Sequence, residues 1–331
     1  MTGISYNDGT TPPVAVSYDQ SSVSGINLTN YLGQPTNAVA ANGSASTIFT
    51  YDTMGRVTED WQCTPLNCGT ANFSLTFGYD YLGDVTSLIN SSESATYTYS
   101  YDTLAHLTKL QSSLSDSNHP GTLLTVNTYN PLGEVTQATL GNGIIRNMGY
   151  DNRGRQTSLS DGSIYSFGLG YAGDSNIVTG NDSINGNWSY TYDDFNRLSA
   201  SNKNSGAQTF TYAYDRYANR WQQNAPQGGP APQYSFNGNN QITGSSVTYD
   251  AAGNVTNDGL GNSYTYDAEN RLTAVSGTNS ASYVYDALGQ RVRSTINSTP
   301  YDFIYNGGHP VDEITASSWV WGDAGALQSA A

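Results

Sequence analysis

One eight-residue pattern recurs along the chain and constrains its fold more than any other feature. It is clearest in the stretch YVYDALGQRV at residues 283–292, where two tyrosines two positions apart point to the same side of an extended strand. Asp286 can accept a hydrogen bond from the backbone N–H two residues later, and Gly289 can take the left-handed conformation that closes a turn. A basic and a β-branched residue then begin a return strand. The pattern therefore predicts a β-hairpin.

Copies of this pattern fill most of the chain. About 14 units start about 21 residues apart, which matches one hairpin per unit. A single hairpin is marginally stable in water, so the units must stack on one another. The copies start at Thr29, Tyr51, Tyr79, Tyr101, Tyr129, Tyr150, Tyr171, Tyr192, Tyr214, Phe236, Tyr249, Tyr266, Tyr285 and Tyr305. The turns that keep both Asp and Gly are predicted at Asp52 and Gly55, Asp80 and Gly83, Asp151 and Gly154, Asp250 and Gly253, and Asp286 and Gly289.

The unit Tyr-Asp-x-x-Gly-Arg/Asn-Val/Leu-Thr at this spacing resembles the YD repeat of the Rhs (rearrangement hot spot) proteins. The resemblance covers roughly residues 29 to 320. It implies an all-β fold, in which an array of β-hairpins forms a spiralling, curved antiparallel sheet. Such a sheet is part of the shell in bacterial Rhs toxins, insecticidal toxin complexes and the teneurin ectodomain.

The repeat also predicts the domain organisation. Residues 1–28 precede the first unit and form a divergent lead-in without a signal peptide. Residues 29–322 form the repeat array, with an irregular Pro-rich loop at 224–232, and residues 323–331 form a tail. Because the array runs almost to the end of the chain, we expect a segment of a longer polypeptide.

Composition limits the function classes. The 331 residues carry a net charge of −15, which opposes binding to nucleic acids and anionic membranes. No apolar run approaches the roughly 18 residues of a membrane helix. Only 37% of residues are hydrophobic, but 26 are Tyr, whose rings suit a thin sheet with one solvated face. Neither an EF-hand loop nor a Gly-Gly-x-Gly-x-Asp calcium repeat is present, so no metal or cofactor is expected.

Cys63 and Cys68 are the only cysteines, and they lie in an insertion between two units. We expect a local disulfide, with free thiols as the alternative. A zinc site needs further ligands, and no His lies nearby in sequence. A disulfide fits an extracellular or cell-surface location.

Catalytic residues cannot be assigned. His106, His119 and His309 all have the surroundings of loop residues, and no Ser-His-Asp, zinc or nucleotide motif accompanies them. Carboxylate pairs suffice for glycoside cleavage. The candidates are Glu93, Glu134, Glu269 and Glu313, and the sequence does not select a pair.

Aromatic side chains on a sheet face can stack on sugar rings. The candidates are Trp61, Trp188, Trp221, Trp319 and Trp321, for which a core or capping role is the alternative.

Two functions follow as hypotheses. The first is a non-catalytic wall or docking segment of a secreted or cell-surface bacterial YD-repeat protein, whose partners are the rest of the parent polypeptide or a cargo domain. The alternative is a glycan-binding module or glycan-active enzyme. The Asp-Pro-rich motif that closes the toxin cores is missing, which leaves no basis for toxin or autoprotease activity.

Overall fold

A computed structural model describes residues 2–68, 73–226, 228–244, 246–315 and 319–321. These residues form β-strands joined by turns, with two short 3₁₀ segments, η1 (Ala41–Gly43) and η2 (Asn204–Gly206), and no α-helix. The all-β hairpin array expected from the sequence is confirmed.

The largest sheet within the described residues has 19 strands, and strands that follow one another in this sheet are antiparallel neighbours. Its strands are β1 (Thr2–Ile4), β2 (Val14–Tyr18), β5 (Pro35–Ala40), β6 (Ala45–Tyr51), β7 (Val57–Cys63), β8 (Phe73–Tyr79), β9 (Val85–Asn90), β10 (Ala95–Tyr101), β11 (Leu107–Ser112), β12 (Thr122–Tyr129), β13 (Val135–Leu140), β14 (Ile145–Tyr150), β15 (Gln156–Asp161), β16 (Tyr165–Tyr171), β17 (Ile177–Asp182), β18 (Gly186–Tyr192), β19 (Leu198–Lys203), β20 (Gln208–Tyr214) and β21 (Arg220–Asn224).

A second sheet holds nine strands of the described chain. They are β24 (Val247–Tyr249), β25 (Val255–Asp258), β26 (Ser263–Tyr266), β27 (Leu272–Ser276), β28 (Ala281–Tyr285), β29 (Arg291–Ile296), β30 (Thr299–Asn306), β31 (His309–Ile314) and β32 (Trp319–Trp321). Two strand pairs complete the fold, β3 (Ser22–Val23) with β4 (Ile26–Asn27) and β22 (Ser235–Phe236) with β23 (Ile242–Thr243).

The repeat tyrosine ends each outgoing strand at a fixed irregularity. In β6 and β7, Thr50 pairs with Glu59, whereas the next residue, Tyr51, pairs with Val57. The same one-residue shift occurs in the hairpins that end at Tyr79, Tyr150, Tyr171, Tyr192, Tyr214, Tyr266, Tyr285 and Tyr305. Such bulges bend a strand and fix its register.

The sheet begins earlier than the repeat pattern predicts. Strand β2, inside the expected lead-in 1–28, pairs directly with β5. The backbone N–H of Asp19 donates to the carbonyl of Gln34 (3.3 Å), so Tyr18 and Asp19 open the first turn. Residues 20–33, which carry β3 and β4, are an insertion within that turn, and this insertion hides the unit from a search by spacing.

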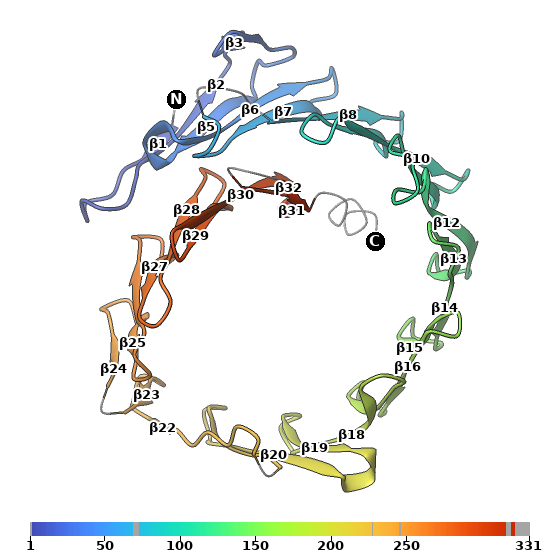
Figure 1. The fold of residues 1–331 in the computed structure, drawn as a ribbon, viewed down its shortest axis with the longest axis vertical. Coiled ribbons are helices and arrows are strands. Elements are labelled where there is room, and N and C mark those ends of the chain that lie inside the picture. The colour runs from blue at the N-terminus through green and yellow to red at the C-terminus, as the bar shows by residue number, and fades with distance from the viewer. Residues whose placement is uncertain (1, 69–72, 227, 245, 316–318, 322–331) are drawn as a thin grey trace. The chain divides into compact units, whose positions relative to one another are not determined.

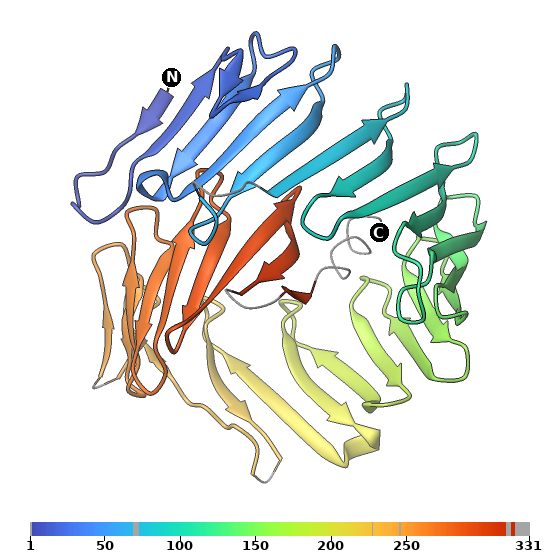
Figure 2. The same cartoon turned by 45° about the horizontal axis from the view of Figure 1, so that its top comes forward.

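The chain divides into two compact units. Unit 1 comprises residues 1–100, 111–115 and 248–331, and unit 2 comprises residues 101–110 and 116–247. In unit 2 the hairpins from β12 to β21 form a single layer, as Figure 2 shows. Its rings and aliphatic groups are consequently half-buried more often than buried.

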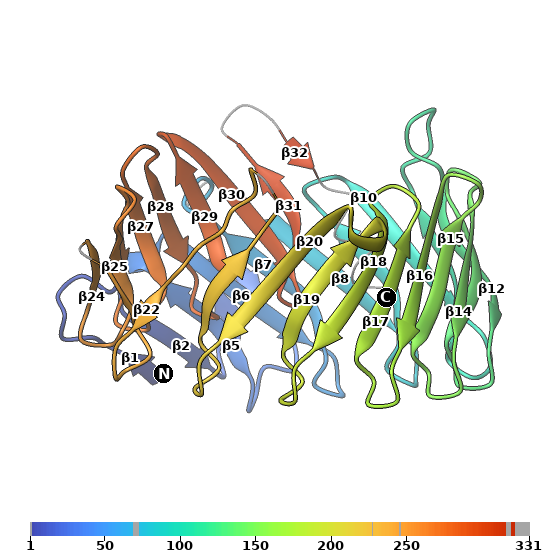
Figure 3. The same cartoon turned by 90° about the horizontal axis from the view of Figure 1, so that it is seen from below.

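Unit 1 has two layers over part of its length. Strands β28 to β31 form a second layer that lies against strands β6 to β9, as can be followed in Figures 1 and 3. The most deeply buried side chains of the described protein occur mainly here, including Leu75 (0% exposed), Tyr97 (2%) and Ile304 (0%). The second layer therefore supplies the core that one sheet lacks.

Candidate functional site

The repeat aspartate organises each turn. Asp52 Oδ1 accepts hydrogen bonds from the backbone N–H groups of Met54 (2.8 Å) and Arg56 (3.0 Å). The N–H of Gly55 donates to the carbonyl of Asp52 (3.0 Å), and the φ angle of Gly55 is +80°. Hydrogen bonds of this kind favour the ionised carboxylate, and the pKa of Asp52 is lowered, chiefly by the backbone N–H of Arg56.

The residue after the glycine position links neighbouring hairpins. Arg56 donates from Nε to Asp52 Oδ2 (2.6 Å) and from Nη1 to the carbonyl of Asp80 in the next turn (2.8 Å). Its guanidinium carbon also lies 4.6 Å from the ring centroid of Tyr79, a cation–π contact. Equivalent stacks join Arg155 to Tyr171, Arg197 to Tyr214 and Arg271 to Tyr285.

Repeat tyrosines make a second connection between hairpins. Their hydroxyls donate to the carbonyl at the start of the preceding return strand, at O–O distances of 2.5 to 3.1 Å. The sequence separation of donor and acceptor varies from 13 to 22 residues, so the same contact recurs from hairpin to hairpin although the loops between them differ in length. The pairs include Tyr51 with Pro35, Tyr79 with Val57, Tyr129 with Leu107, Tyr171 with Gln156, Tyr192 with Ile177, Tyr214 with Leu198 and Tyr305 with Arg291.

A buried polar contact joins the two layers of unit 1. We call the contact of residues 60–68 and 90–92 with residues 302–312 the seam. Gln62 Oε1 accepts from the backbone N–H of Tyr305 (2.9 Å), and Gln62 Nε2 donates to the carbonyl of Tyr305 (2.6 Å). One side chain thus satisfies both backbone groups of a residue in the opposite layer, as a paired strand would.

Two buried aspartates complete the seam. Asp302 Oδ2 accepts from the backbone N–H of Leu66 (2.8 Å), and the same carboxylate forms an ion pair with Arg293. Asp312 Oδ2 accepts from Asn90 Nδ2 (3.0 Å) and from Ser92 Oγ (2.7 Å). Breaking such buried hydrogen-bonded pairs is costly, so these contacts specify how the layers dock.

The carboxyl of Asp60 lies at the seam without a cation. It is 9% exposed, and Oδ1 accepts a hydrogen bond from Gln62 Nε2 (2.9 Å). Burial raises the pKa of Asp60 to about 7, and the hydrogen bond from Gln62 opposes this rise. Burial also raises the pKa of Asp286, to about 6. The pKa of the turn aspartate is thus lowered at Asp52 but raised at Asp286, where the carboxyl is buried.

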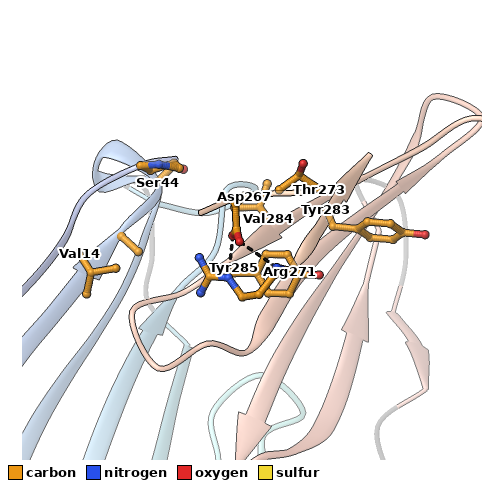
Figure 4. Close-up of a pocket in the computed structure, with 10 residues that line it drawn as sticks. Val14, Ser44, Asp267, Arg271, Thr273, Tyr283, Val284 and Tyr285 are labelled. Carbon is orange, nitrogen blue, oxygen red and sulfur yellow. Dashed lines mark hydrogen bonds and ion pairs between the residues drawn. The ribbon is translucent and has the colours of Figure 1, made fainter. Parts of the chain in front are cut away.

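Two cavities lie between early and late strands of unit 1. The larger, about 420 Å³, is lined by Asp60, Gln62 and aromatic side chains. The smaller, about 240 Å³, is shown in Figure 4, where the ion pair of Asp267 and Arg271 lies beside Tyr285. A hydrogen bond from the backbone N–H of Ala268 to Thr11 Oγ1 (2.8 Å) holds the turn before β27 to the N-terminal segment.

Comparison with known proteins identifies the family. Residues 5–223, more than half of the chain, match the teneurin YD-shell family. The chain belongs to the teneurin YD-shell family. A curated relative is the tRNA3(Ser)-specific nuclease WapA of Bacillus spizizenii, 31% identical over 134 residues, which are 36% of this chain and 6% of WapA.

Solved structures show the same fold at low sequence identity. The TcdB2–TccC3 crystal structure has a TM-score of 0.74 and 13% identity, covering 92% of this chain and 19% of that chain. A Photorhabdus luminescens Tc holotoxin pore with mutated TccC3 has a TM-score of 0.69 and 14% identity, over 91% of this chain and 20% of that one. The YD-shell chain thus spans about a fifth of these structures and a small part of WapA.

The tryptophans of the YD shell occupy different surroundings. Trp61 packs with Val23, Leu28 and Ile48 in a small core beneath the β3–β4 insertion. Trp188 stacks with Tyr190, at a centroid distance of 6.5 Å, in β18. Trp221, in β21, is 39% exposed. Trp319 and Trp321 form the ends of β32, and their side chains lie outside the described residues, as does the expected tail 323–331.

The histidines are not brought together into a site. His106 Nδ1 lies 3.2 Å from Asp102 Oδ2, and its ring stacks on Tyr129 at 4.6 Å, so it takes the place of the repeat arginine. His119 contacts Asp116 in an exposed turn. His309 is the first residue of β31, so its expected position in a loop is wrong; the Gly307–Gly308 turn ends one residue earlier.

Each candidate glutamate has a structural contact. Glu93 accepts a hydrogen bond from the Tyr97 hydroxyl (2.7 Å), and Glu134 from Asn130 Nδ2 (2.6 Å). Glu269 pairs with Arg271 (3.0 Å), and Glu313 is the cross-strand partner of Phe303 in the pairing of β31 with β30. In the described part of the chain, no three His, Cys, Asp or Glu side chains gather into a metal site.

Cys63 and Cys68 are joined by a disulfide with a Cα–Cα distance of 4.9 Å. The bond closes the loop that presents the N–H of Leu66 to Asp302 at the seam. The insertion is therefore a docking element of unit 1.

Sequence reasoning missed Asp60, although a signal was present. Asp60 follows the repeat threonine by two positions, where other hairpins have Leu88 and Leu110, both buried. A charged residue at a core position of a repeat marks a special contact.

Proposed function

We propose that this YD-shell segment is a non-catalytic wall of a larger secreted or cell-surface bacterial polypeptide. The observation that carries the proposal is the use of the repeat's polar groups. Asp, Arg and Tyr of successive hairpins bind one another and the backbone, as in the contacts of Asp52, Arg56 and Tyr79. These contacts give each of the three side chains a structural role in joining one hairpin to the next.

The partners we propose are the rest of the parent polypeptide and a cargo domain. WapA and the TccC3 complexes are much longer than this chain, and WapA is named as a nuclease. The match covers only 6% of WapA, so its nuclease activity is not carried over to this segment. No helix of the described residues is long and apolar enough to cross a membrane.

The test is a carbohydrate array followed by incubation of the purified chain with every bound glycan, and separately with tRNA. We expect neither binding nor cleavage. Glycan binding without products would support a lectin-like module. Turnover that a Glu→Gln or His→Ala change abolishes, at unchanged melting temperature, would overturn the proposal and establish an enzyme.

A further inference from the structure

The larger of the two cavities described above has the form of a ligand site. Strands β6, β7 and β8 contribute Phe49, Asp60 and Phe77 to one side, and the late hairpins contribute Gln290 and Tyr305 to the other. Its volume of about 420 Å³ lies within the range of small-molecule pockets, roughly 300–1,000 Å³. The strand register supports this arrangement, because Phe49 and Asp60 are direct cross-strand partners and share a face.

Asp60 is the one carboxyl among the described residues that line this cavity. Gln62 Nε2 donates a hydrogen bond to Asp60 Oδ1, whereas Asp60 Oδ2 has no hydrogen-bond partner within the described chain. Asp302, which is 1% exposed against 9% for Asp60, is neutralised by Arg293 from the neighbouring strand. None of the described lining residues is Lys, Arg or His, so Asp60 lacks the counter-ion that Asp302 has.

The remaining walls suit a cation attached to an apolar group. Phe49, Phe77 and Tyr305 line the cavity together with Tyr79, whose ring already stacks with Arg56. Aromatic rings attract ammonium and guanidinium groups through their faces. The net charge of −15 raises the local concentration of cations around the whole protein.

We propose that this cavity binds an organic cation, an ammonium or guanidinium group on an apolar stem, with Asp60 as its counter-ion. The cation comes either from a free amine or from a lysine or arginine side chain of a polypeptide held on this face. The site does not depend on the wall function, because a shell segment with or without enzymatic activity would contain it.

Ionisation of Asp60 sets the pH dependence of binding. The titratable side chains that line the cavity with it are Tyr79, at the end of β8 on the same side, and Tyr305, from the late hairpins on the other side. Glu59 precedes Asp60 on β7. Because the free protein favours the neutral acid, affinity rises as pH increases through about 7. A bound cation in turn lowers the pKa of Asp60.

The experiment titrates the whole chain by calorimetry with agmatine and cadaverine, and with the N-acetylated, C-amidated peptides Gly-Arg-Gly and Gly-Lys-Gly. The equally blocked peptide Gly-norleucine-Gly, which has the apolar stem without any charge, is the neutral control. We expect the cations to bind and the neutral peptide not to bind. A preference for the free amines or for the peptides identifies the source.

Substitutions test which side chains of the cavity bind the cation. Asp60→Asn should weaken cation binding roughly 10- to 100-fold, because it removes a charge-assisted hydrogen bond. Phe49→Leu should weaken it roughly 2- to 30-fold through loss of the ring face. The matched control is Glu59→Gln, which removes the adjacent charge but lies on the other face of the strand, opposite Thr50 and Thr76.

NMR titration of the Asp60 carboxyl carbon provides a readout independent of affinity. Saturating agmatine should move its midpoint to lower pH. No cation binding at millimolar concentration, equal binding to Asp60→Asn, or an unmoved midpoint would each overturn the proposal.

Discussion

Replacing Asp60 with Asn should change how the stability of unit 1 depends on pH. The folded-state pKa of Asp60 is raised from 3.8 to about 7 by burial, so folding favours the protonated acid. The stabilisation is fully present below the unfolded pKa of 3.8 and is lost as pH rises through about 7. At pH 8 the buried carboxylate therefore destabilises the folded protein.

The pKa shift sets the size of the effect. About 3 pKa units at about 1.4 kcal/mol each give an upper bound of about 4 kcal/mol between pH 4 and pH 8. Asn keeps an oxygen that can accept from Gln62 but carries no charge. Asp60→Asn should thus raise the free energy of unfolding by up to this amount at pH 8 and leave it nearly unchanged at pH 4.

Urea unfolding followed by fluorescence at pH 4, 6 and 8 measures this difference. Glu59→Gln serves as the control for loss of a charge, and it should keep most of the wild-type pH dependence. Asp286, whose pKa is about 6, should leave a smaller residual dependence at lower pH in Asp60→Asn. Identical pH profiles for the wild type and Asp60→Asn would refute a buried carboxyl at the seam.

Three further predictions concern the turns and the insertion. Gly289→Val should lower stability by roughly 1–3 kcal/mol, since φ is +82° there and no atom crowds the site, so strain alone acts. The control Gly238→Val lies in a turn with equal space and no positive φ, and an equal loss in melting temperature would contradict the strain argument. Ala105→Gly should stabilise by up to about 1 kcal/mol, because Ala105 has a φ of +63°; thermal unfolding that is unchanged or easier would count against it. Replacing Cys63 and Cys68 by Ser should cost about 2 kcal/mol yet permit folding, since the closed loop is short; intact-mass measurement after alkylation establishes the bond in the wild type, and two alkylated thiols there would exclude it.

The turns could be predicted from sequence because their causes are local. Gly55 and Gly289 have positive φ angles, and Asn196 and Asn270 take the same conformation where glycine is missing. These conformations follow from residue type and spacing within a few positions. These turns fix the register of the two strands in each hairpin.

The seam could not be predicted, because its partners are far apart in sequence. Gln62 and Tyr305 are separated by 243 residues, and Asn90 and Asp312 by 222. No periodicity indicates which hairpins of a long array will meet. The first turn was missed for a related reason, since the insertion after Asp19 breaks the spacing on which repeat detection depends.

Because of the tyrosine contacts, the loops at the two ends of the strands differ in how freely their length can change. Tyr79 and Tyr150 each reach the preceding return strand, although 22 residues separate one pair and 15 the other. The difference is taken up by the connections at the strand ends opposite the aspartate turns. The connection between β7 and β8 begins at residue 64 and contains the Cys63–Cys68 loop, whereas residues 141–144 alone join β13 to β14. The loops at the strand ends opposite the aspartate turns can therefore be lengthened while the hairpins keep their alignment. These loops are the natural place to graft peptides or domains onto a YD shell.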